Sequence, residues 1–537
     1  MKSETRQSRI VLTTFNAKYI HASLGLRYLF ANMGELQSET VIQEFTLLLS
    51  AEDAAERLLK RNPDIIGFGV YLWNTELTLA TIQIIKSVAP DICIVIGGPE
   101  VSHEQQHQAI CQRADYVVSG AADIRFRELC EDLLTNDSIH PSATLPQQLS
   151  STPVSLDNLE LPYHHYTDED LKNRIIYVEA SRGCPFKCEF CLSSLDKTAE
   201  PFPLARLLAA LHDLYLRGAR HFKFVDRTFN LKIASCIRIL DFFLELKSAD
   251  LFLHFELIPD RLPDALKQRI ASFPEAQIQF EIGIQSFNVD VQALISRRQN
   301  MQKTIDNLIW LRENSGAYIH ADLIFGLPGE SLESFADGFN QLVALDPHEI
   351  QVGLLKRLRG TPINRHTAAF NMRYQTQPPY RILQTGLIDY QTMQRMVRFA
   401  RYWDLVGNSG RFKNVLPFLL GSDPFRQFLQ LSDWLHDTTG RTHRIALARL
   451  FLLIKQWAED AGNCAGQWRS ALDEDCRGAG FDLSVLSDPV TTKPGPGHGN
   501  AENCDNQKPS EKRQIVQPTA NTDRQSRHKR RGQTSVV

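Results

Sequence analysis

Three cysteines stand close together in the segment Cys184-Pro-Phe-Lys-Cys188-Glu-Phe-Cys191. Thiolates are soft metal ligands, and they are the usual ligands of iron–sulfur clusters. A cubane [4Fe–4S] cluster has four irons, so three thiolates leave one iron open, as a catalytic zinc site keeps one position open for a small molecule. The spacing therefore predicts a [4Fe–4S] cluster held by Cys184, Cys188 and Cys191, with a free coordination position.

A structural zinc site is the alternative interpretation of these cysteines. Such a site takes four ligands, usually as two pairs of cysteines, and no second pair follows in this sequence. Cys236 stands alone inside a helical pattern. A disulfide does not suit an odd number of cysteines in a reducing compartment. The cluster is therefore the interpretation that we carry forward.

Two arrays of alternating strands and helices follow one another in the sequence, and the second array positions these cysteines. Six apolar runs rich in β-branched and aromatic residues alternate with helical patterns between residues 173 and 365. The array predicts parallel strands in a partial, TIM-like (β/α)6 barrel or an open sheet, with the chemistry at the carboxyl ends of the strands. Those ends carry the cysteine segment, Asp226, Glu256, Gln285 with Ser286, and residues 326–330.

An earlier array occupies residues 1–140 and also alternates strands with helices. Five apolar runs, at residues 9–15, 40–46, 64–70, 93–98 and 116–120, predict a parallel sheet with helices on both faces, in a flavodoxin- or Rossmann-like fold. Ligands of such sheets bind beyond the carboxyl ends of the strands. One of these ends carries Gly97-Gly98-Pro99-Glu100, a turn in which glycines permit close approach of a ligand.

The remaining segments have simpler predictions. Residues 141–172 are rich in Pro, Ser, Thr and Asp, and we expect a surface linker without regular helix or strand. Residues 366–487 lose the strand pattern and predict a mostly helical domain. Residues 488–537 contain few apolar residues and end in a basic stretch, which predicts a disordered tail.

Composition excludes several classes of protein. The 537 residues contain 59 Lys plus Arg and 62 Asp plus Glu, so a net charge of −3 gives no strong signal for nucleic acid binding. No apolar run reaches the roughly 18 residues of a membrane helix, and the polar start lacks a signal-peptide core. We therefore expect a cytoplasmic protein with no membrane partner and with reduced cysteines.

The second array resembles the radical S-adenosylmethionine (SAM) superfamily. The C-x3-C-x2-C loop after its first strand matches the superfamily's cluster loop, and further segments resemble the superfamily in order and position. These segments are Phe224–Asn230, Glu281–Ser286, Asp322–Glu330 and Leu354–Thr361. The resemblance covers about residues 174–365, and it implies reductive cleavage of SAM bound at the open iron, with electrons from an external donor such as flavodoxin or ferredoxin.

The resemblance also implies which side chains meet SAM: Phe190, Asp226, Glu256, Gln285, Ser286 and Gly326. Gln285 and Ser286 end a strand in which Gly283 permits close approach, which suits a place near the ribose, and the other four have plainer alternatives. Phe190 would pack on the adenine or serve as a core aromatic, and Asp226 would bind the methionine amine or cap its turn. Glu256 would bind the ribose or the substrate, or pair with Arg261. Gly326 also suits turn geometry alone. The segment at Asp226 lacks the two glycines and glutamate common in the superfamily.

The first array resembles the cobalamin (B12)-binding domain of the B12-dependent radical SAM class. Gly97 and Gly98 would then approach the corrin or its nucleotide tail. His21 lacks the surrounding Asp-x-His-x-x-Gly pattern, so we do not expect it to bind cobalt. Residues 119–123 also depart from the Gly-Glu-Gly-Glu run common at this position, so a domain without cobalamin stays a possible reading.

The whole arrangement resembles B12-binding-domain radical SAM proteins with a DUF4080 C-terminal domain. It implies an enzyme that performs cobalamin-dependent methyl transfer or a radical rearrangement on an unknown substrate. One alternative is a radical SAM enzyme without cobalamin, whose first domain is a platform for a substrate or partner. Another is a non-catalytic iron–sulfur sensor. The sequence names neither the substrate nor the oligomeric state.

Overall fold

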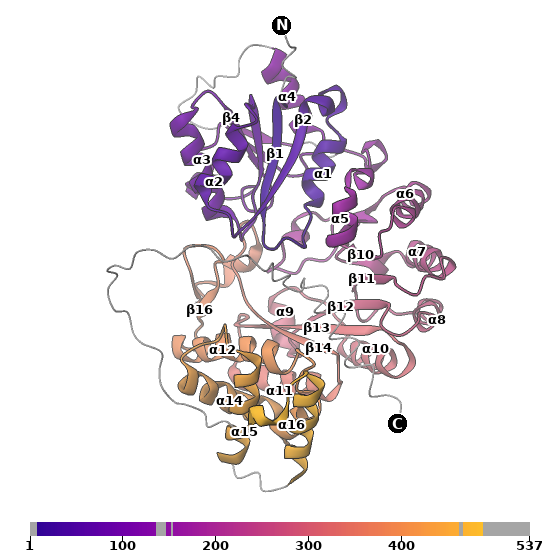
Figure 1. Cartoon of the computed structure of the whole chain (residues 1–537), viewed down its shortest axis with the longest axis vertical. Coiled ribbons are helices and arrows are strands. Elements are labelled where there is room, and N and C mark those ends of the chain that lie inside the picture. The colour runs from indigo at the N-terminus through magenta and orange to yellow at the C-terminus, as the bar shows by residue number, and fades with distance from the viewer. Residues whose placement is uncertain (1–7, 136–146, 152–153, 461–465, 487–537) are drawn as a thin grey trace.

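The computed structural model describes residues 8–135, 147–151, 154–460 and 466–486. Three regions follow one another along the chain: an N-terminal sheet with helices on both faces, a second sheet, and a group of C-terminal helices (Figure 1). This order confirms the predicted fold class. The predicted tail at residues 488–537 lies outside the described residues.

The N-terminal sheet is wholly parallel, with strand order β2-β1-β3-β4-β5-β6. Its strands are β1 (Ile10–Asn16), β2 (Thr40–Thr46), β3 (Ile65–Gly69), β4 (Cys93–Gly97), β5 (Tyr116–Ser119) and β6 (Gln147–Ser150). Its helices are α1 (Leu24–Ala31), α2 (Ala51–Leu59), α3 (Thr75–Val88) and α4 (Arg125–Thr135). Helices α2 and α3 bury one face of the sheet and α1 and α4 the other, as a doubly wound fold requires.

The second sheet is also parallel, and its strands follow the chain in simple order, β7-β10-β11-β12-β13-β14. They are β7 (Ile176–Val178), β10 (His221–Phe224), β11 (Phe252–Leu257), β12 (Ile278–Gln285), β13 (Tyr318–Phe325) and β14 (Glu349–Leu354). The intervening helices are α6 (Leu204–Leu216), α7 (Ile233–Glu245), α8 (Asp264–Ala271), α9 (Val289–Leu294), α10 (Met301–Asn314) and α11 (Leu332–Ala344). Strands β7 and β14 are the two ends of the order, so this is an incomplete barrel.

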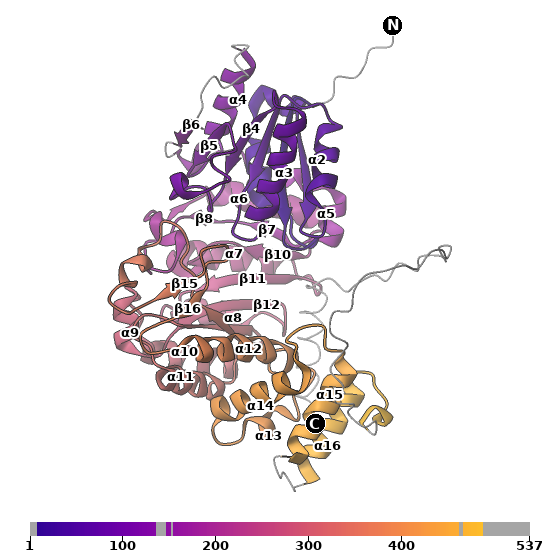
Figure 2. The ribbon, with the colours of Figure 1, turned by 90° about the vertical axis from the view of Figure 1, so that its left-hand side faces the viewer.

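The C-terminal region is mostly helical, as predicted, and it shares its core with the second sheet. It contains α12 (Tyr390–Val406), α13 (Leu416–Leu420), α14 (Pro424–Thr439), α15 (Leu447–Asp460) and α16 (Gly466–Gly478). The Phe339 ring of α11 packs edge-on against Trp403 of α12, with centroids 4.9 Å apart. A short hairpin of β15 (Arg373–Tyr374) and β16 (Ile382–Gln384), absent from our prediction, lies beside the second sheet in Figure 2.

The segment predicted as a surface linker is more ordered than we expected. It contains the edge strand β6 and the helix α5 (Asp168–Asn173), so the prediction of no helix or strand is wrong for its described part. Helix α5 begins with a capping box between Thr167 and Asp170. Tyr163 and Tyr166 are both 1% exposed, and each hydroxyl donates to a backbone carbonyl near β7. These buried tyrosines anchor the segment between the two sheets.

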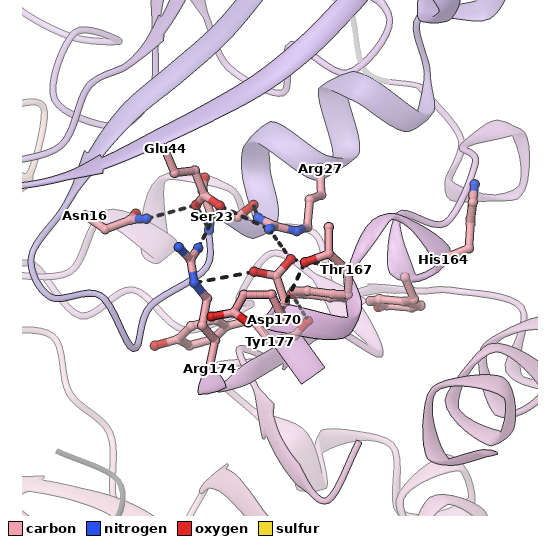
Figure 3. Close-up of polar contacts among 12 residues, drawn as sticks. Asn16, Ser23, Arg27, Glu44, His164, Thr167, Asp170, Arg174 and Tyr177 are labelled. Atoms are coloured by element: carbon pink, nitrogen blue, oxygen red, sulfur yellow. Dashed lines mark hydrogen bonds and ion pairs between the residues drawn. The ribbon is translucent and has the colours of Figure 1, made fainter. Parts of the chain in front are cut away.

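A buried cluster of charges joins the N-terminal domain to this segment (Figure 3). Arg27 Nη2 on α1 lies 2.7 Å from Asp170 Oδ2 and 3.0 Å from Glu44 Oε2. Arg174 Nη1 completes the cluster, 2.9 Å from the same Glu44 oxygen. All of these side chains are at most 13% exposed, so each charge depends on its partners.

Candidate functional site

The cysteine segment lies where the second sheet predicts chemistry. It follows β7 and the two-residue strand β8 (Ser181–Arg182), which pairs with β9 (Glu200–Pro201) across the loop. The thiols of Cys184, Cys188 and Cys191 line a cavity of about 250 Å³ at the carboxyl ends of β10 to β13. The structure thus brings all three predicted cluster ligands to one cavity.

The donor set fits a cluster better than a single metal ion. The three cysteines form no disulfide. Across the described ranges, no group of three or more His, Cys, Asp or Glu side chains is arranged to hold one ion. In a cubane each thiolate binds a different iron, so three sulfurs need not converge on one point. The residues present therefore suit a [4Fe–4S] cluster, and they give no support to the zinc alternative.

Arg297 contributes a positive charge beside the thiols. Its Nη1 lies 3.6 Å from Cys188 Sγ. Burial raises the pKa of the Cys188 thiol, and Arg297 opposes that rise. A guanidinium here favours the thiolate form that metal binding requires. No pattern in the sequence marked Arg297, because it comes from the loop after α9, far along the chain from the cysteines.

Charged side chains from adjacent strands line the same cavity. Glu256 of β11 and Glu281 of β12 are paired residues in the sheet. Arg227 Nη1 lies 2.6 Å from Glu256 Oε1. Burial nevertheless raises the pKa of Glu256 to about 7. Burial also raises the pKa of Glu281, but the His254 hydrogen bond and the Lys223 charge outweigh it and hold that pKa well below its usual range.

Three residues predicted to meet SAM do line this cavity: Phe190, Glu256 and Gln285. Gln285 ends β12 with a φ of 72°, a backbone conformation that residues other than glycine rarely adopt. Its Oε1 atom is buried and accepts no hydrogen bond within the described parts of the chain. A buried acceptor without a donor is costly, so this oxygen fits a ligand that carries a hydroxyl or amino group. Glu256 pairs with Arg227 rather than with Arg261.

The other three predicted residues lie behind the cavity wall. Asp226 accepts hydrogen bonds from Ala180 N at 2.9 Å and Ser181 Oγ at 2.6 Å, and burial raises its pKa to about 6. Ser286 donates to Glu330 Oε1 at 2.5 Å. Gly326 has a φ of 87°, and a Cβ there would lie 2.8 Å from a methyl group of Ile382. In this structure these residues shape the loops around the cavity.

A second cavity, of about 340 Å³, lies between the N-terminal sheet and helices α1 and α4, and Glu179 and Arg182 of the second domain also line it. Gly97 and Gly98, the two residues predicted to meet cobalamin, line it together with Gly67, Gly69 and Gly120. Gly98 has a φ of 113°, and a Cβ there would lie 2.5 Å from a backbone oxygen. A Cβ at Gly98 would thus meet protein backbone, and the main chain of these glycines borders the cavity near the ends of β3, β4 and β5, which fits the approach of a large planar cofactor or its tail.

His21 does not line that cavity. Its Nδ1 lies 2.7 Å from the hydroxyl of Tyr177, and the residue forms a backbone bridge with Ile175 at the start of β7. These contacts join His21 to the second domain, and the residue stays outside the glycine-lined cavity.

Sequence reasoning also missed the contact between the turn after β4 and the end of β14. Glu100 is 4% exposed and accepts from the Tyr380 hydroxyl at 2.7 Å and from Arg359 Nε at 3.0 Å. Arg359 Nη1 also lies 3.1 Å from Glu104. Burial raises the pKa of Glu100, which the two donors oppose. Charged residues in turns are usually solvated, so no local signal marked this contact.

Known protein families match all three regions. Residues 10–130 match the B12 binding domain, residues 178–342 the radical SAM superfamily, and residues 368–474 a protein family of unknown function, DUF4080. The chain thus contains a radical SAM domain. More closely, that domain follows a B12 binding domain and precedes a DUF4080 region, in the predicted order.

These matches confirm the predicted architecture, and with it an enzyme of the class that uses a [4Fe–4S] cluster and SAM, with a cobalamin-binding domain. The matched ranges agree in order with the predicted domains, although they do not test the exact boundaries. Within the described residues, no helix is both long and apolar enough to cross a membrane.

Individual relatives are distant. The uncharacterized methyltransferase PH0819 of Pyrococcus horikoshii is 24% identical over 378 residues, covering 65% of this chain and 79% of the relative. The cobalamin-dependent radical SAM methyltransferase TokK of Streptomyces tokunonensis is 24% identical over 361 residues, 59% of this chain. This chain spans only half of TokK's length.

Solved structures share the fold at lower identity. The cobalamin-dependent SAM radical enzyme OxsB with aqua-cobalamin bound has a TM-score of 0.60 at 13% identity, over 90% of this chain and 82% of that one. The radical SAM methyltransferase TsrM from Kitasatospora setae, with cobalamin and a [4Fe–4S] cluster bound, has a TM-score of 0.53 at 16% identity, over 69% and 82%.

Proposed function

We propose that this chain is a cobalamin-dependent radical SAM methyltransferase acting in the cytoplasm on a substrate still to be identified. The observation that carries the proposal is the pair of cavities at strand ends, one lined by three thiols and the other by glycines. The relatives named as methyltransferases support the same reaction. Their low identity leaves the substrate open.

Cys184, Cys188 and Cys191 would hold the cluster, and Gly97 and Gly98 would make room for cobalamin. When bound, the reduced cluster supplies the electron that cleaves SAM, and cobalamin supplies a carrier for a methyl group. The reducing electron would come from an external protein such as flavodoxin or ferredoxin. Reduced thiols in the cytoplasm suit this assignment.

The chain's own side chains would bind and orient SAM. The Gln285 side-chain oxygen has no donor among the residues that the structure describes, and it would accept a hydrogen bond from a hydroxyl or amino group of SAM. Phe190 would offer an apolar surface to the adenine. Glu256, held by Arg227, would accept from the ribose or from the substrate. Asp226 would act indirectly, because it fixes the start of the cysteine loop through Ala180 and Ser181.

Anaerobic purification tests the cofactor set. The wild-type chain should contain about four irons and one cobalt, show the visible absorption of a corrinoid, and release 5′-deoxyadenosine from SAM under reduction. Cys188→Ala should lose the iron and the SAM cleavage. Cys236 is a buried cysteine on α7, and Cys236→Ala should keep both.

Each failure of this experiment has a distinct meaning. Iron with cleavage but no cobalt would leave a radical SAM enzyme without cobalamin. Iron without cleavage would point to a sensor. Zinc, or iron retained by Cys188→Ala, would refute the assigned cluster site.

A further inference from the structure

A buried carboxylate lies inside the cysteine loop itself. Glu189 stands between Cys188 and Phe190, and it is 2% exposed. A buried charge is costly unless it is paired and hydrogen-bonded. Lys187, two positions earlier, is exposed. Lys187 is thus solvated, whereas the Glu189 carboxylate is buried and needs partners within the protein.

Both carboxylate oxygens of Glu189 have partners from distant parts of the chain. Oε1 accepts from Ser296 Oγ at 2.6 Å and also contacts the Arg365 guanidinium. Oε2 lies 2.9 Å from His366 Nε2. The carboxylate is therefore held from the loop after α9 on one side and from residues 365–366 on the other.

The backbone of Glu189 is held by the same two segments. Its N–H donates to Ile295 O at 3.0 Å, and its carbonyl accepts from Ile363 N at 3.0 Å. Four separate groups of one residue thus bind segments that lie more than 100 positions away in the sequence. Such contacts restrict both the position and the orientation of the loop between Cys188 and Cys191.

One of these segments also reaches the N-terminal domain. Residues 355–366, which we call the strap, follow β14 and contact Glu189 at their far end. Closer to β14 the strap carries Arg359, which pairs with Glu100 and Glu104 after β4. The strap therefore contacts the N-terminal domain through Arg359 and the cysteine loop through Arg365 and His366. The partners of Glu189 thus belong to a segment whose own position is restrained.

We propose that Glu189 is a positioning residue: its carboxylate fastens the cysteine loop to the strap and to Ser296, and so presets the loop for cluster binding. The proposal rests on the proposed function in one respect, that the loop binds a cluster. The fastening uses contacts made by protein groups alone. It should therefore be measurable in the metal-free chain as well as in the loaded one.

Alkylation of the metal-free chain tests the fastening without any cofactor. Iodoacetamide labelling of Cys184, Cys188 and Cys191 is followed peptide by peptide, with the buried Cys236 as an internal reference for global unfolding. Glu189→Ala should label the loop about tenfold faster or more, because each charge-assisted hydrogen bond lost corresponds to roughly that factor. Lys187→Ala, the matched control, should label at the wild-type rate.

The loaded chain gives a second readout. After anaerobic reconstitution, Glu189→Ala should release iron to a chelator about tenfold faster than wild type and should broaden the electron paramagnetic resonance signal of the reduced cluster. Glu189→Gln keeps the shape and the Ser296 bond but loses the charge, so its iron-release rate should lie between those of wild type and Glu189→Ala. Arg365→Ala removes one partner from the exposed side and should shift both rates in the same direction, even if Glu189→Ala fails to fold.

The proposal would be overturned if Glu189→Ala and Arg365→Ala both had the labelling and iron-release rates of the wild type. Loss of Cys236 protection in Arg365→Ala as well would also overturn it, because Glu189 would then support the whole fold rather than the loop. A wild-type chain that binds no cluster would refute the proposed function, while the labelling rates would still decide the fastening.

Discussion

Glu330 offers a quantitative test of the electrostatics behind the cavity that the three cysteines line. Its carboxyl is 1% exposed, accepts one hydrogen bond from Ser286, and has a second oxygen without a partner among the described residues. Burial raises its pKa to about 7. In the unfolded chain a glutamate titrates near its ordinary value of about 4.3. The folded state thus holds a proton between these two pH values that the unfolded state has lost.

The sign of the effect on stability follows from this difference. Because the folded state binds more protons, stability falls as the pH rises from about 4 to about 7, and the full cost is present above that. A difference of about 2.7 pKa units corresponds to roughly 4 kcal/mol at pH 8, and to about 1 kcal/mol at pH 5. Glu330→Gln, which resembles the protonated form, should remove this cost.

The assay is thermal unfolding of the metal-free chain between pH 5 and pH 8. Glu330→Gln should melt higher than wild type by roughly 4–6 °C at pH 8, and the difference should shrink as the pH falls. Glu333→Gln, an exposed residue in the first turn of α11, is the matched control and should show a small difference at every pH. A pH-independent difference for Glu330→Gln would refute the reasoning.

Three further predictions concern the two cavities and the domain junction. Gly98→Ala should destabilise the chain by about 2 kcal/mol or more and weaken cobalamin binding in a spectroscopic titration, whereas Gly218→Ala, also at positive φ but facing open space, should cost about 1 kcal/mol and bind normally. Asp170→Asn should cost about 3 kcal/mol in urea unfolding, because it breaks a buried ion pair, and the exposed Asp168→Asn should cost far less; equal midpoints would contradict this. Gln285→Leu should weaken SAM binding roughly three- to tenfold in equilibrium dialysis with the iron content unchanged, and unchanged binding would remove Gln285 from the site.

The alternating apolar runs made most of the fold predictable. The inner strands of the two parallel sheets are buried on both faces, so they stand out as short hydrophobic runs. Strand β6 was missed because Gln147–Ser150 is a polar, largely exposed edge strand. Helix α5 was missed because its stability comes from a capping box and from buried tyrosines that contact β7, and no periodicity in the sequence reveals such distant partners.

The candidate site was predictable only where residue type carries chemistry. The cysteine spacing and the order of motifs located the cavity, and Phe190, Glu256 and Gln285, which we predict to meet SAM, line it. Position along a strand could not separate residues that face the cavity from those behind it, such as Asp226. Nor could it find Glu189 and Arg297, whose roles depend on contacts between segments far apart in the sequence.

The charge cluster at the domain junction affects how the two halves of the chain would meet. Each half contributes one cation and one anion: Arg27 and Glu44 from the first, Asp170 and Arg174 from the second. Such a set has strong attraction at contact but little net field at a distance, since the opposite charges on each half cancel beyond a few ångströms. This cluster therefore favours one relative orientation of the two halves at contact and adds little long-range attraction between them.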